Sequence, residues 1–414
     1  MKAILLTIAI LIALTFSSYC GNYSHKSTFE RYGPEVGTIL LDSTDGKIIK
    51  SHPGVASYGR QDRHSLIPPS SIVSGLTWLG PRVPYPGNYK ADTYPLTWAD
   101  NDLIYSSGGD PVSEKKQDGL NFISVSGNPG SYNISVINDM PDFRGWGGQG
   151  LKPTGMLCRK GVLYLFAHNL GKRANENMEK CHGYDAQIFM SEDKGKTWQP
   201  DIRLVEKSPM FPGRDFGSPC FVNYGKDNAG ATDGFIYALS GQGWANGNFL
   251  KVGRVMADKI MDIKAWEFIG KFKSNGKPVW VKDFKAAIPV LRDSGFLGYP
   301  ECVYIKSLKR YLIMGWKFKV EKPEKYSPDD GSELVIYEAP QPWGPFSVVV
   351  RMDWETPEVT PYNPRLPLKW FDDEKLEGYL LFSGSWRNGG SSEFYRMQLR
   401  HFKLERVKIR GNQK

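Results

Sequence analysis

Four acidic residues stand where strand-like apolar segments begin or end, although they are far apart in the sequence. They are Asp92, Asp110, Asp215 and Glu301. Two carboxyl groups held side by side can break a glycosidic bond, because one gives a proton to the leaving oxygen while the other activates water or attacks the anomeric carbon. We therefore predict that the catalytic groups of this chain are found among these four residues.

Each acid also has an ordinary structural explanation. Asp92 could cap the turn before its strand, and Asp110 could be an ordinary turn residue. Asp215 could form an ion pair with the preceding residue, Arg214. Glu301 opens an otherwise apolar segment, where a buried carboxylate is costly unless it has a purpose. The residue types alone leave open which two acids form the pair.

Cations and aromatic residues occur at corresponding positions in the same segments. Cationic side chains anchor hydroxyl or acidic groups of a sugar, and aromatic faces stack on sugar rings. Tryptophans at such places are more often core residues, and a histidine there is more often structural. The predicted substrate-binding residues are Lys152, Arg214, His168, Tyr299, Trp316 and Trp386.

Five turn-rich segments must position these side chains. They open near residues 92, 152, 215, 299 and 361, at intervals of about 60 to 84 residues, and each precedes an apolar strand that is answered by a second one. Such a period predicts an all-β, five-bladed β-propeller, in which the first strand of every blade lies at a common axis. Residues far apart in sequence would then face one another at one mouth.

The inner hairpin of each blade can be placed from its apolar runs and turns. An outer strand is expected to follow the inner hairpin of each blade, over 122–126, 187–191, 249–255, 333–338 and 394–404. The inner pairs are predicted at 94–98 with 103–107, 154–158 with 162–168, 218–224 with 235–240, 301–305 with 311–316, and 365 with 379–383.

One turn carries a specific local motif. Residues 191–198 read Ser-Glu-Asp-Lys-Gly-Lys-Thr-Trp, which fits the Asp box found in sialidases and other propellers. The Ser and Asp side chains of such a box bond the turn backbone, glycine supplies a positive φ, and tryptophan packs beneath the hairpin. We predict a sialidase-like hairpin in one blade and a structural role for Asp193.

The bulk composition excludes several classes of protein. The chain has 414 residues with 44 Gly and 28 Pro, and no stretch has the sustained period of a long helix. The net charge of +9 is dispersed, so no nucleic-acid site is predicted. No metal site or cofactor is predicted either, because Cys and His show no ligand spacing. We expect a monomer whose partner is a polysaccharide or oligosaccharide.

The N-terminus has the pattern of an export signal. Residues 1–19 carry a lysine before a short apolar run, and Cys20 stands where a bacterial lipoprotein is cleaved and lipidated. We predict a signal peptide over 1–19, a lipoprotein-type tether over 20–35 and one propeller over 36–410. The protein would be exported to the periplasm or cell surface, where a disulfide such as Cys158–Cys181 is permitted.

Four strings of the sequence together resemble one bacterial propeller family. They begin at Asp92-Thr-Tyr-Pro, Phe216-Gly-Ser-Pro, Arg310-Tyr-Leu-Ile and Glu338-Ala-Pro-Gln, and the likeness spans roughly residues 88–405. The family has long been catalogued as a domain of unknown function, and some members are glycoside hydrolases that cleave D-arabinan. The resemblance implies a five-bladed propeller, cleavage of a glycosidic bond, and functional carboxylates at Asp92 and Asp110.

A looser likeness connects the chain with five-bladed fructan and arabinan hydrolases. Arg214-Asp215 and Glu301-Cys302 are similar to parts of their acidic triad, although Asp215 is not followed by proline. Asp215 and Glu301 therefore remain the competing pair. Two other functions also stay open, a carbohydrate-binding propeller without catalysis and a polysaccharide lyase that uses His168 or Tyr299 as base.

Overall fold

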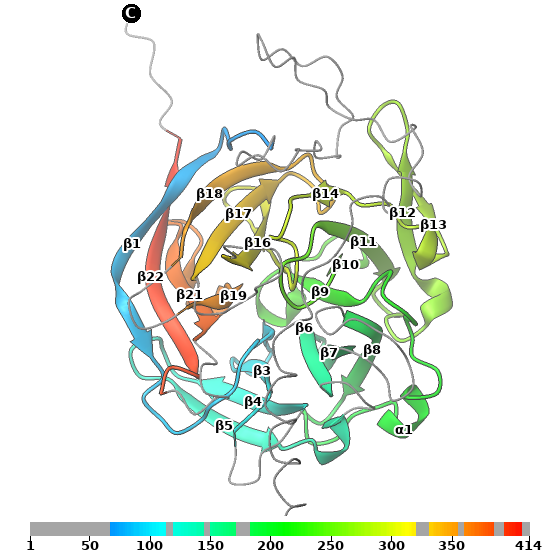
Figure 1. Cartoon of the computed structure of the whole chain (residues 1–414), viewed down its shortest axis with the longest axis horizontal. Helices are drawn as coiled ribbons and strands as arrows, with labels where there is room; N and C mark the ends of the chain where they lie inside the picture. The colour runs from blue at the N-terminus through cyan, green and yellow to red at the C-terminus, as the bar shows by residue number, and fades with distance from the viewer. Residues whose placement is uncertain are drawn as a thin grey trace, which may run out of the picture.

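The computed structural model describes residues 67–112, 119–144, 150–170, 183–319, 331–354, 360–384 and 393–407. Figure 1 shows the sheets of this part of the chain arranged radially about a common centre, with β19, β9 and β6 near the middle and β1, β5 and β13 at the rim. The predicted five-bladed propeller is confirmed. The predicted signal peptide (1–19), tether (20–35), Cys20, Cys181 and Trp386 lie outside the described residues.

The first two blades follow each other in chain order. The turn between β6 and β7 has positive φ at Lys160 (50°) and Gly161 (75°), the backbone form that matches a two-residue hairpin. The strands of the first blade are β2 (Leu96–Trp98), β3 (Ile104–Gly109), β4 (Leu120–Ser126) and β5 (Asn133–Asn138), and those of the second are β6 (Leu151–Arg159), β7 (Val162–Leu170) and β8 (Gly183–Ser191).

The third and fourth blades share one sheet. They are joined at the axis by parallel pairing of β9 with β15, in which Cys302 lies opposite Val222. The third blade contains β9 (Ser218–Asn223), β10 (Phe235–Gly241), β11 (Phe249–Met256), β12 (Glu267–Phe272) and β13 (Pro278–Val281), with β14 (Leu291–Arg292) beside β11. The fourth contains β15 (Glu301–Ile305), β16 (Arg310–Phe318), β17 (Ser332–Ala339) and β18 (Ser347–Asp353).

The fifth blade closes the ring with a strand from the other end of the described chain. The N-terminal strand β1 (Val73–Pro84) pairs antiparallel with β22 (Met397–Arg406) and becomes the outermost strand of this blade. The inner strands are β19 (Tyr362–Arg365) and β21 (Glu377–Ser383), and β20 (Phe371–Asp372) pairs with β21. This closing strand lies outside the predicted hairpins.

Helices are short and lie in the connections. Among the described residues, one four-residue α-helix follows the second blade, and the other helical segments are single 3-10 turns. They are α1 (Ile202–Val205) and the 3-10 segments Pro141–Arg144, Lys226–Asn228, Ile263–Ala265, Phe284–Ala286 and Leu368–Trp370. Within the described residues, no helix is long and apolar enough to cross a membrane.

Apolar side chains fill the wedges between neighbouring blades. Between the second and third blades, Phe166 packs on Phe221 with ring centroids 4.2 Å apart, and Trp266 lies beside them. The inner strands come very close near the axis, where a Cβ added to Gly155 would lie 2.8 Å from the Cα of Cys220. A side chain at Gly155 would therefore collide with the neighbouring inner strand β9.

The Asp box forms the predicted hydrogen bonds. The hydroxyl of Ser191 donates to Asp193 at 2.8 Å, Asp193 accepts from the backbone N–H of Thr197 at 2.9 Å, and Gly195 has a φ of 91°. Trp198 packs edge-on against Phe122 of the first blade at 5.0 Å. The structural role predicted for Asp193 is confirmed, and the turn also links two blades.

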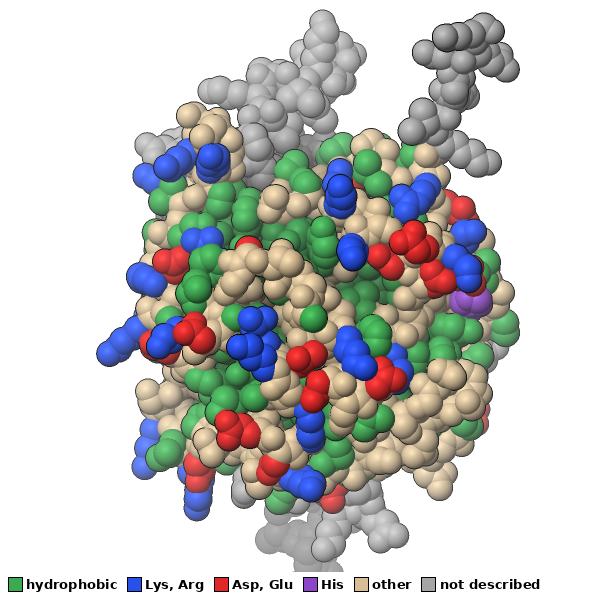
Figure 2. Space-filling view, turned by 180° about the vertical axis from the view of Figure 1, so that it is seen from behind, with side chains coloured by type: hydrophobic (Ala, Val, Ile, Leu, Met, Phe, Trp, Pro, Cys, Tyr) green, Lys and Arg blue, Asp and Glu red, His purple; other side chains and the backbone are tan. Residues whose placement is uncertain are grey.

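Charged side chains are dispersed over the surface. Figure 2 shows Lys and Arg interspersed with Asp and Glu over the face opposite to that of Figure 1. This distribution agrees with the dispersed charge of the sequence, and mixed signs weaken any long-range field.

Candidate active site

Asp92 and Asp110 come together at one mouth of the axis because they flank the first inner hairpin. The backbone of Asp92 pairs with Gly109, the last residue of β3, through two hydrogen bonds of 2.9 and 2.8 Å, and Asp110 follows directly after it. The two carboxyl groups interact electrostatically, since the charge of Asp110 raises the pKa of Asp92. The structure therefore brings this predicted pair to one place.

The Asp92 carboxyl group is buried, and its surroundings favour the protonated form. Burial first, and the nearby Asp110 second, raise its pKa from the ordinary 3.8 to about 7, against the lowering effects of Lys152, Tyr362 and Tyr395. The hydroxyl of Tyr362 donates to Oδ2 of Asp92 at 3.0 Å. The other oxygen, Oδ1, has no hydrogen-bond partner among the described residues.

Asp110 presents the opposite environment. Its side chain is 44% exposed, and it forms an ion pair with the ammonium group of Lys152, which is only 3% exposed. Lys152 lies in β6 of the second blade, so this ion pair connects two blades at the mouth. The site thus combines a buried carboxyl group with a raised pKa and an exposed carboxyl group held in an ion pair.

Gly109 leaves room for the Asp92 side chain. A Cβ added to Gly109 would lie 2.7 Å from Oδ1 of Asp92 and 2.9 Å from Oγ1 of Thr93. Both distances are shorter than real Cβ contacts, so any side chain at this position would displace the two oxygens. The second glycine of the Gly-Gly-Asp110 sequence is therefore required by packing against Asp92 rather than by a turn.

His168 and Tyr299 form a closed network beside this pair. The Nδ1 atom of His168 lies 2.5 Å from the carbonyl oxygen of Gly217, and Nε2 lies 2.5 Å from the hydroxyl of Tyr299. A carbonyl only accepts, so Nδ1 donates and Nε2 accepts the proton of Tyr299. Burial lowers the pKa of His168 to about 3 and raises that of Tyr299 well above its ordinary value.

Glu301 is engaged in a buried ion pair. The guanidinium of Arg365 lies 3.1 Å from Oε2 of Glu301 and has no exposed surface. Arg365 also donates to the carbonyls of Thr93 and Pro300 at 3.0 and 2.9 Å. Burial raises the pKa of Glu301 to about 7 although Arg365 lowers it. Glu301 thus lies at the axis but inside the protein.

Asp215 is paired with a different cation from the one that holds Asp110. Its side chain is 39% exposed and forms an ion pair of 3.5 Å with Lys251. Lys251 belongs to β11, the third strand of its blade, which is farther from the axis than the inner strands. Arg214 is exposed beside Asp215. Asp215 and Glu301 are therefore held by different cations in different surroundings.

Trp316 has a core position instead of the predicted substrate-binding position. Its side chain is fully buried, with ring centroids 6.0 Å from Trp244 and 5.7 Å from Tyr362. A sugar platform needs an exposed ring face, so Trp316 is removed from the set of stacking residues.

Residues of the last blade complete the site, and the sequence did not single them out. Tyr362 and Ser383 contact the Asp92–Thr93 backbone and side chains, since the N–H of Thr93 donates to Oγ of Ser383 at 2.9 Å. The hydroxyl of Tyr395 donates to the carbonyl of Asp110 at 3.2 Å. Only Tyr362 had a signal, its place in a blade-opening turn.

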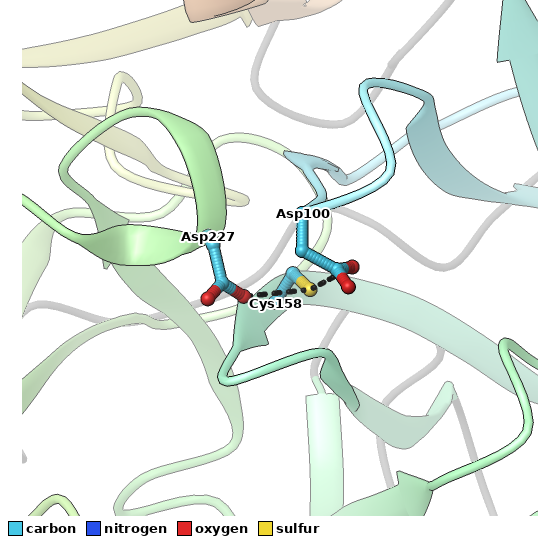
Figure 3. A group of neighbouring side chains, drawn as sticks. All are labelled: Asp100, Cys158 and Asp227. Carbon is cyan, nitrogen blue, oxygen red and sulfur yellow. Dashed lines mark hydrogen bonds between the residues drawn. The ribbon is translucent and has the colours of Figure 1, made fainter.

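A second group of titratable side chains lies at the other end of the inner strands. Figure 3 shows the thiol of Cys158 between Asp100 and Asp227. Its Sγ lies 3.3 Å from Oδ1 of Asp227 and 3.9 Å from Oδ1 of Asp100. Burial raises the pKa of Cys158 to about 12, so the thiol is protonated and donates.

The two carboxylates of this group have other partners as well. Asp227 accepts hydrogen bonds of 3.0 Å from the backbone N–H groups of Lys160 and Gly161, and Asp100 pairs with Lys194. These contacts connect the turns of the first three blades, and they describe a structural junction.

Comparisons with known proteins give fold likeness alone. No protein-family model matches this chain, and no curated protein matches it either. The resemblance to the D-arabinan-cleaving family therefore stays a prediction.

Several solved structures are similar to this chain in part. The GH43_1 enzyme from Xanthomonas citri complexed with xylotriose is 13% identical, covering 78% of this chain and 89% of its own, with a TM-score of 0.47. The alpha-L-arabinofuranosidase from Podospora anserina in complex with cellotriose is 9% identical, covering 84% and 94%, with a TM-score of 0.42. The endo-arabinase from Bacteroides thetaiotaomicron is 11% identical, covering 80% and 98%, also at 0.42. Likeness at this level assigns no activity or residue.

Proposed function

We propose that this protein is a glycoside hydrolase that cleaves a bond in an extracellular polysaccharide. The observation that carries the proposal is the pair Asp92 and Asp110, two carboxyl groups at one mouth in opposite environments. One is buried, with a pKa raised to about 7, and the other is exposed and paired with Lys152. Pairs of acids whose surroundings drive their protonation apart are typical of glycosidases.

The contacts suggest a role for each acid. Asp92, whose pKa is raised by burial, would give its proton to the leaving glycosidic oxygen and would be the general acid. Asp110, which is paired with Lys152, would activate water or attack the anomeric carbon. Lys152 would hold Asp110 in place.

The polysaccharide to test first is an arabinan. This choice rests on the resemblance of the sequence strings around Asp92 and Phe216 to a family with D-arabinan-cleaving members. Nothing in the arrangement of Asp92 and Asp110 conflicts with it, because a carboxyl pair serves pyranosides and furanosides alike.

The state of His168 and Tyr299 favours hydrolysis over a lyase reaction. A lyase base must take a proton from the sugar, but Nε2 of His168 already accepts from Tyr299. Tyr299 is in turn a poor base, because its pKa is raised well above the ordinary value and it rarely becomes a phenolate. A binding propeller without catalysis remains the second candidate, and the release of reducing ends separates the two.

We also propose export and anchoring of the monomeric protein at the cell surface. The support is the apolar run before Cys20, which has the length and flanks of a signal segment. A substrate too large to enter cells would then meet the enzyme outside. Mass spectrometry of the mature N-terminus would test this proposal, with a lipid-modified Cys20 as the expected result.

The activity is tested with a panel of purified polysaccharides, including D-arabinan and L-arabinan, and detection of new reducing ends. We expect the Asp92→Asn and Asp110→Asn variants to lose activity by a factor of 10² or more, since each removes one acid–base function. Asp215→Asn and Glu301→Gln undergo the same assay, because they form the competing pair.

Asp353→Asn provides the matched control. Asp353 is a 77% exposed acid paired with Lys319, far out on β18, and its loss should leave the rate unchanged. Full activity of both Asp92→Asn and Asp110→Asn on a glycan that the wild type cleaves would overturn the assignment.

A further inference from the structure

A pocket that is open to solvent lies at the seam between the fifth and first blades. Its volume is about 530 Å³, which is within the range of small-ligand sites. The fifth blade supplies most of the wall, from the segment before β21 and from β21 and β22, and the turn between β4 and β5 of the first blade completes it (Figure 1). The lining includes Asn128, Trp370, Phe371, Glu377, Tyr379 and His401.

This pocket is separate from the candidate acids. Strand β21 begins at Glu377, in the pocket, and ends at Ser383, which accepts a hydrogen bond from the N–H of Thr93 beside Asp92. An extended strand advances about 3.3 Å per residue, so the two ends of β21 lie about 20 Å apart. A molecule in the pocket therefore leaves the mouth with the candidate acids accessible.

Partly exposed aromatic rings form part of the wall. The rings of Tyr379 and His401 are stacked, with centroids 4.6 Å apart and an interplanar angle of 9°, because the two residues are directly opposite on β21 and β22. Phe371 is also partly exposed, whereas Trp370 is buried and donates to the carbonyl of Gly127 at 3.2 Å, which fixes the seam. Partly exposed rings of this kind pack against the C–H groups of a sugar.

Polar groups without partners accompany these rings. The hydroxyl of Tyr379 has no hydrogen-bond partner among the described residues. His401 bonds Oε1 of Glu377 through Nε2 at 3.0 Å, and its Nδ1 has no partner in the same part of the chain. Asn128 adds an amide from an exposed turn position. Such donors and acceptors complement the hydroxyl groups of a sugar.

The charged groups of the lining are already paired. Each Lys, His, Asp and Glu of the pocket has a partner of the opposite type at 3.0 or 3.1 Å, namely Lys369 with Asp102, Lys375 with Asp372 and His401 with Glu377. The lining therefore presents no unpaired charge to an ionic ligand, and its chemistry suits an uncharged ligand that is rich in hydroxyl groups.

We propose that this pocket binds a short neutral segment of a glycan and anchors the protein on the polysaccharide that it cleaves. The choice of a glycan rests on the proposed function, but the pocket is distinct from the site of cleavage. A polysaccharide held at two places on one protein dissociates more slowly than one held at a single place. The anchor would thus raise the affinity for a polymer without taking part in the reaction at Asp92.

Substitutions in the wall and at the rim of the pocket test the proposal. Tyr379→Ala removes the ring and the hydroxyl, Tyr379→Phe removes the hydroxyl alone, and Asn128→Trp places a large side chain at the exposed turn. Tyr164→Ala is the matched control, because Tyr164 is a partly exposed tyrosine at the equivalent place near the start of β7, in the second blade. Binding of neutral arabino- and xylo-oligosaccharides is measured by calorimetry on the full chain carrying Asp92→Asn, which prevents cleavage, and Tm is recorded for every variant.

We expect Tyr379→Ala and Asn128→Trp to remove one binding event or to weaken it at least 10-fold, with Tyr379→Phe between them and the parent. Tyr164→Ala should bind as the parent does, and Tm should stay within a few degrees throughout. A merely structural role of Tyr379 would lower Tm and leave the affinity of the folded protein unchanged. Asn128→Trp would then also bind like the parent, and the proposal would be overturned.

The outcomes separate this inference from the proposed function. If the wild type cleaves no glycan but binds a neutral oligosaccharide that Tyr379→Ala and Asn128→Trp bind poorly, hydrolysis fails and the inference stands. If the wild type cleaves a glycan that both pocket variants bind as the parent does, the function stands and the inference fails. Binding of oligo-uronates alone, or no binding of any neutral oligosaccharide, also overturns the inference.

Discussion

Tyr362 of the last blade donates a hydrogen bond of 3.0 Å to Asp92 of the first blade, across 270 positions of the sequence. The same junction contains the bond from the Thr93 N–H to Ser383 and the bond from Tyr395 to the Asp110 carbonyl. The candidate acid is therefore set by the junction between the first and fifth blades, with Lys152 added from the second. Each of these contacts makes a prediction that can be measured.

Removal of the Tyr362 hydroxyl should shift the pH dependence of activity upward. This hydroxyl stabilises the charged form of Asp92, so Tyr362→Phe raises the pKa of Asp92 above its value of about 7. If Asp92 must be protonated, the alkaline limb of the kcat/KM profile moves to higher pH by about one unit. Tyr304→Phe, in the aromatic cluster with Tyr224, is the control. A downward shift would contradict the role of Asp92 as acid.

Substitution of Gly109 by alanine should reduce activity without unfolding the protein. The new methyl group would meet Oδ1 of Asp92 and Oγ1 of Thr93 at less than 3 Å and push both out of position. A displacement of about 1 Å at a reacting group can cost a factor of about 10² in rate. Gly130→Ala is the matched control, because nothing lies within 4 Å of its added Cβ. Equal activity of the two variants would be the contrary result.

Loss of the Lys152 ammonium should affect both carboxyl groups. Lys152→Met removes the ion pair of Asp110 and a charge that lowers the pKa of Asp92. We expect kcat/KM to fall by about 10² and the alkaline limb to move to higher pH. Lys194→Met offers an unusually close control, since Lys194 pairs with an Asp100 side chain that is also 44% exposed, at the other mouth. Similar losses in both variants would point to a general structural effect.

The ion pair between Glu301 and Arg365 should contribute measurably to the free energy of unfolding. Removal of one partner of a buried ion pair leaves an uncompensated charge and costs about 3–5 kcal/mol. Glu301→Gln and Arg365→Met should each lower the free energy of unfolding on that scale, while the double variant loses clearly less than the sum. Urea titrations of the four proteins give the coupling energy. Additive losses would show that the pair is not coupled.

The stability of the protein should fall as the pH rises through the neutral range. Asp92 has a folded-state pKa of about 7 against an ordinary value of 3.8, so the folded chain keeps a proton that the unfolded chain releases. Its stabilising contribution is complete below pH 4 and disappears between about pH 4 and 7. Glu301 acts in the same direction. Urea midpoints measured from pH 5 to 8 should decline, and Asp92→Asn should flatten the decline.

Repetition in the sequence predicted more of the fold than of the site. Turn segments and apolar runs recur in every blade because each blade packs against its neighbours in the same way. The inner hairpins, and the end of the axis where their first strands begin, could therefore be placed from the sequence. The closing strand β1 was not foreseen, because its pairing with β22 depends on a contact between the two ends of the described chain. Local periodicity carries no information about such a contact.

The candidate site, like the fold, could be predicted only in part. Asp92 and Asp110 could be placed together because they flank one hairpin, and antiparallel pairing brings such residues to one end. Burial could not be read from residue types, so Trp316 was taken for a sugar platform although it lies in the core. Tyr395 has no local signal at all, since it follows β21 in a connection and reaches Asp110 only through the ring.

The pairing of β1 with β22 has a consequence for a chain that emerges from its N-terminus. The first blade, with both candidate carboxyl groups, is made early, whereas Tyr362, Ser383 and Tyr395 are made late. A chain that stops short of β22 therefore has its acids but lacks the groups that tune them. Catalytic competence would therefore be acquired only when the ring closes. The rate at which newly synthesised protein begins to form product would then measure the rate of ring closure.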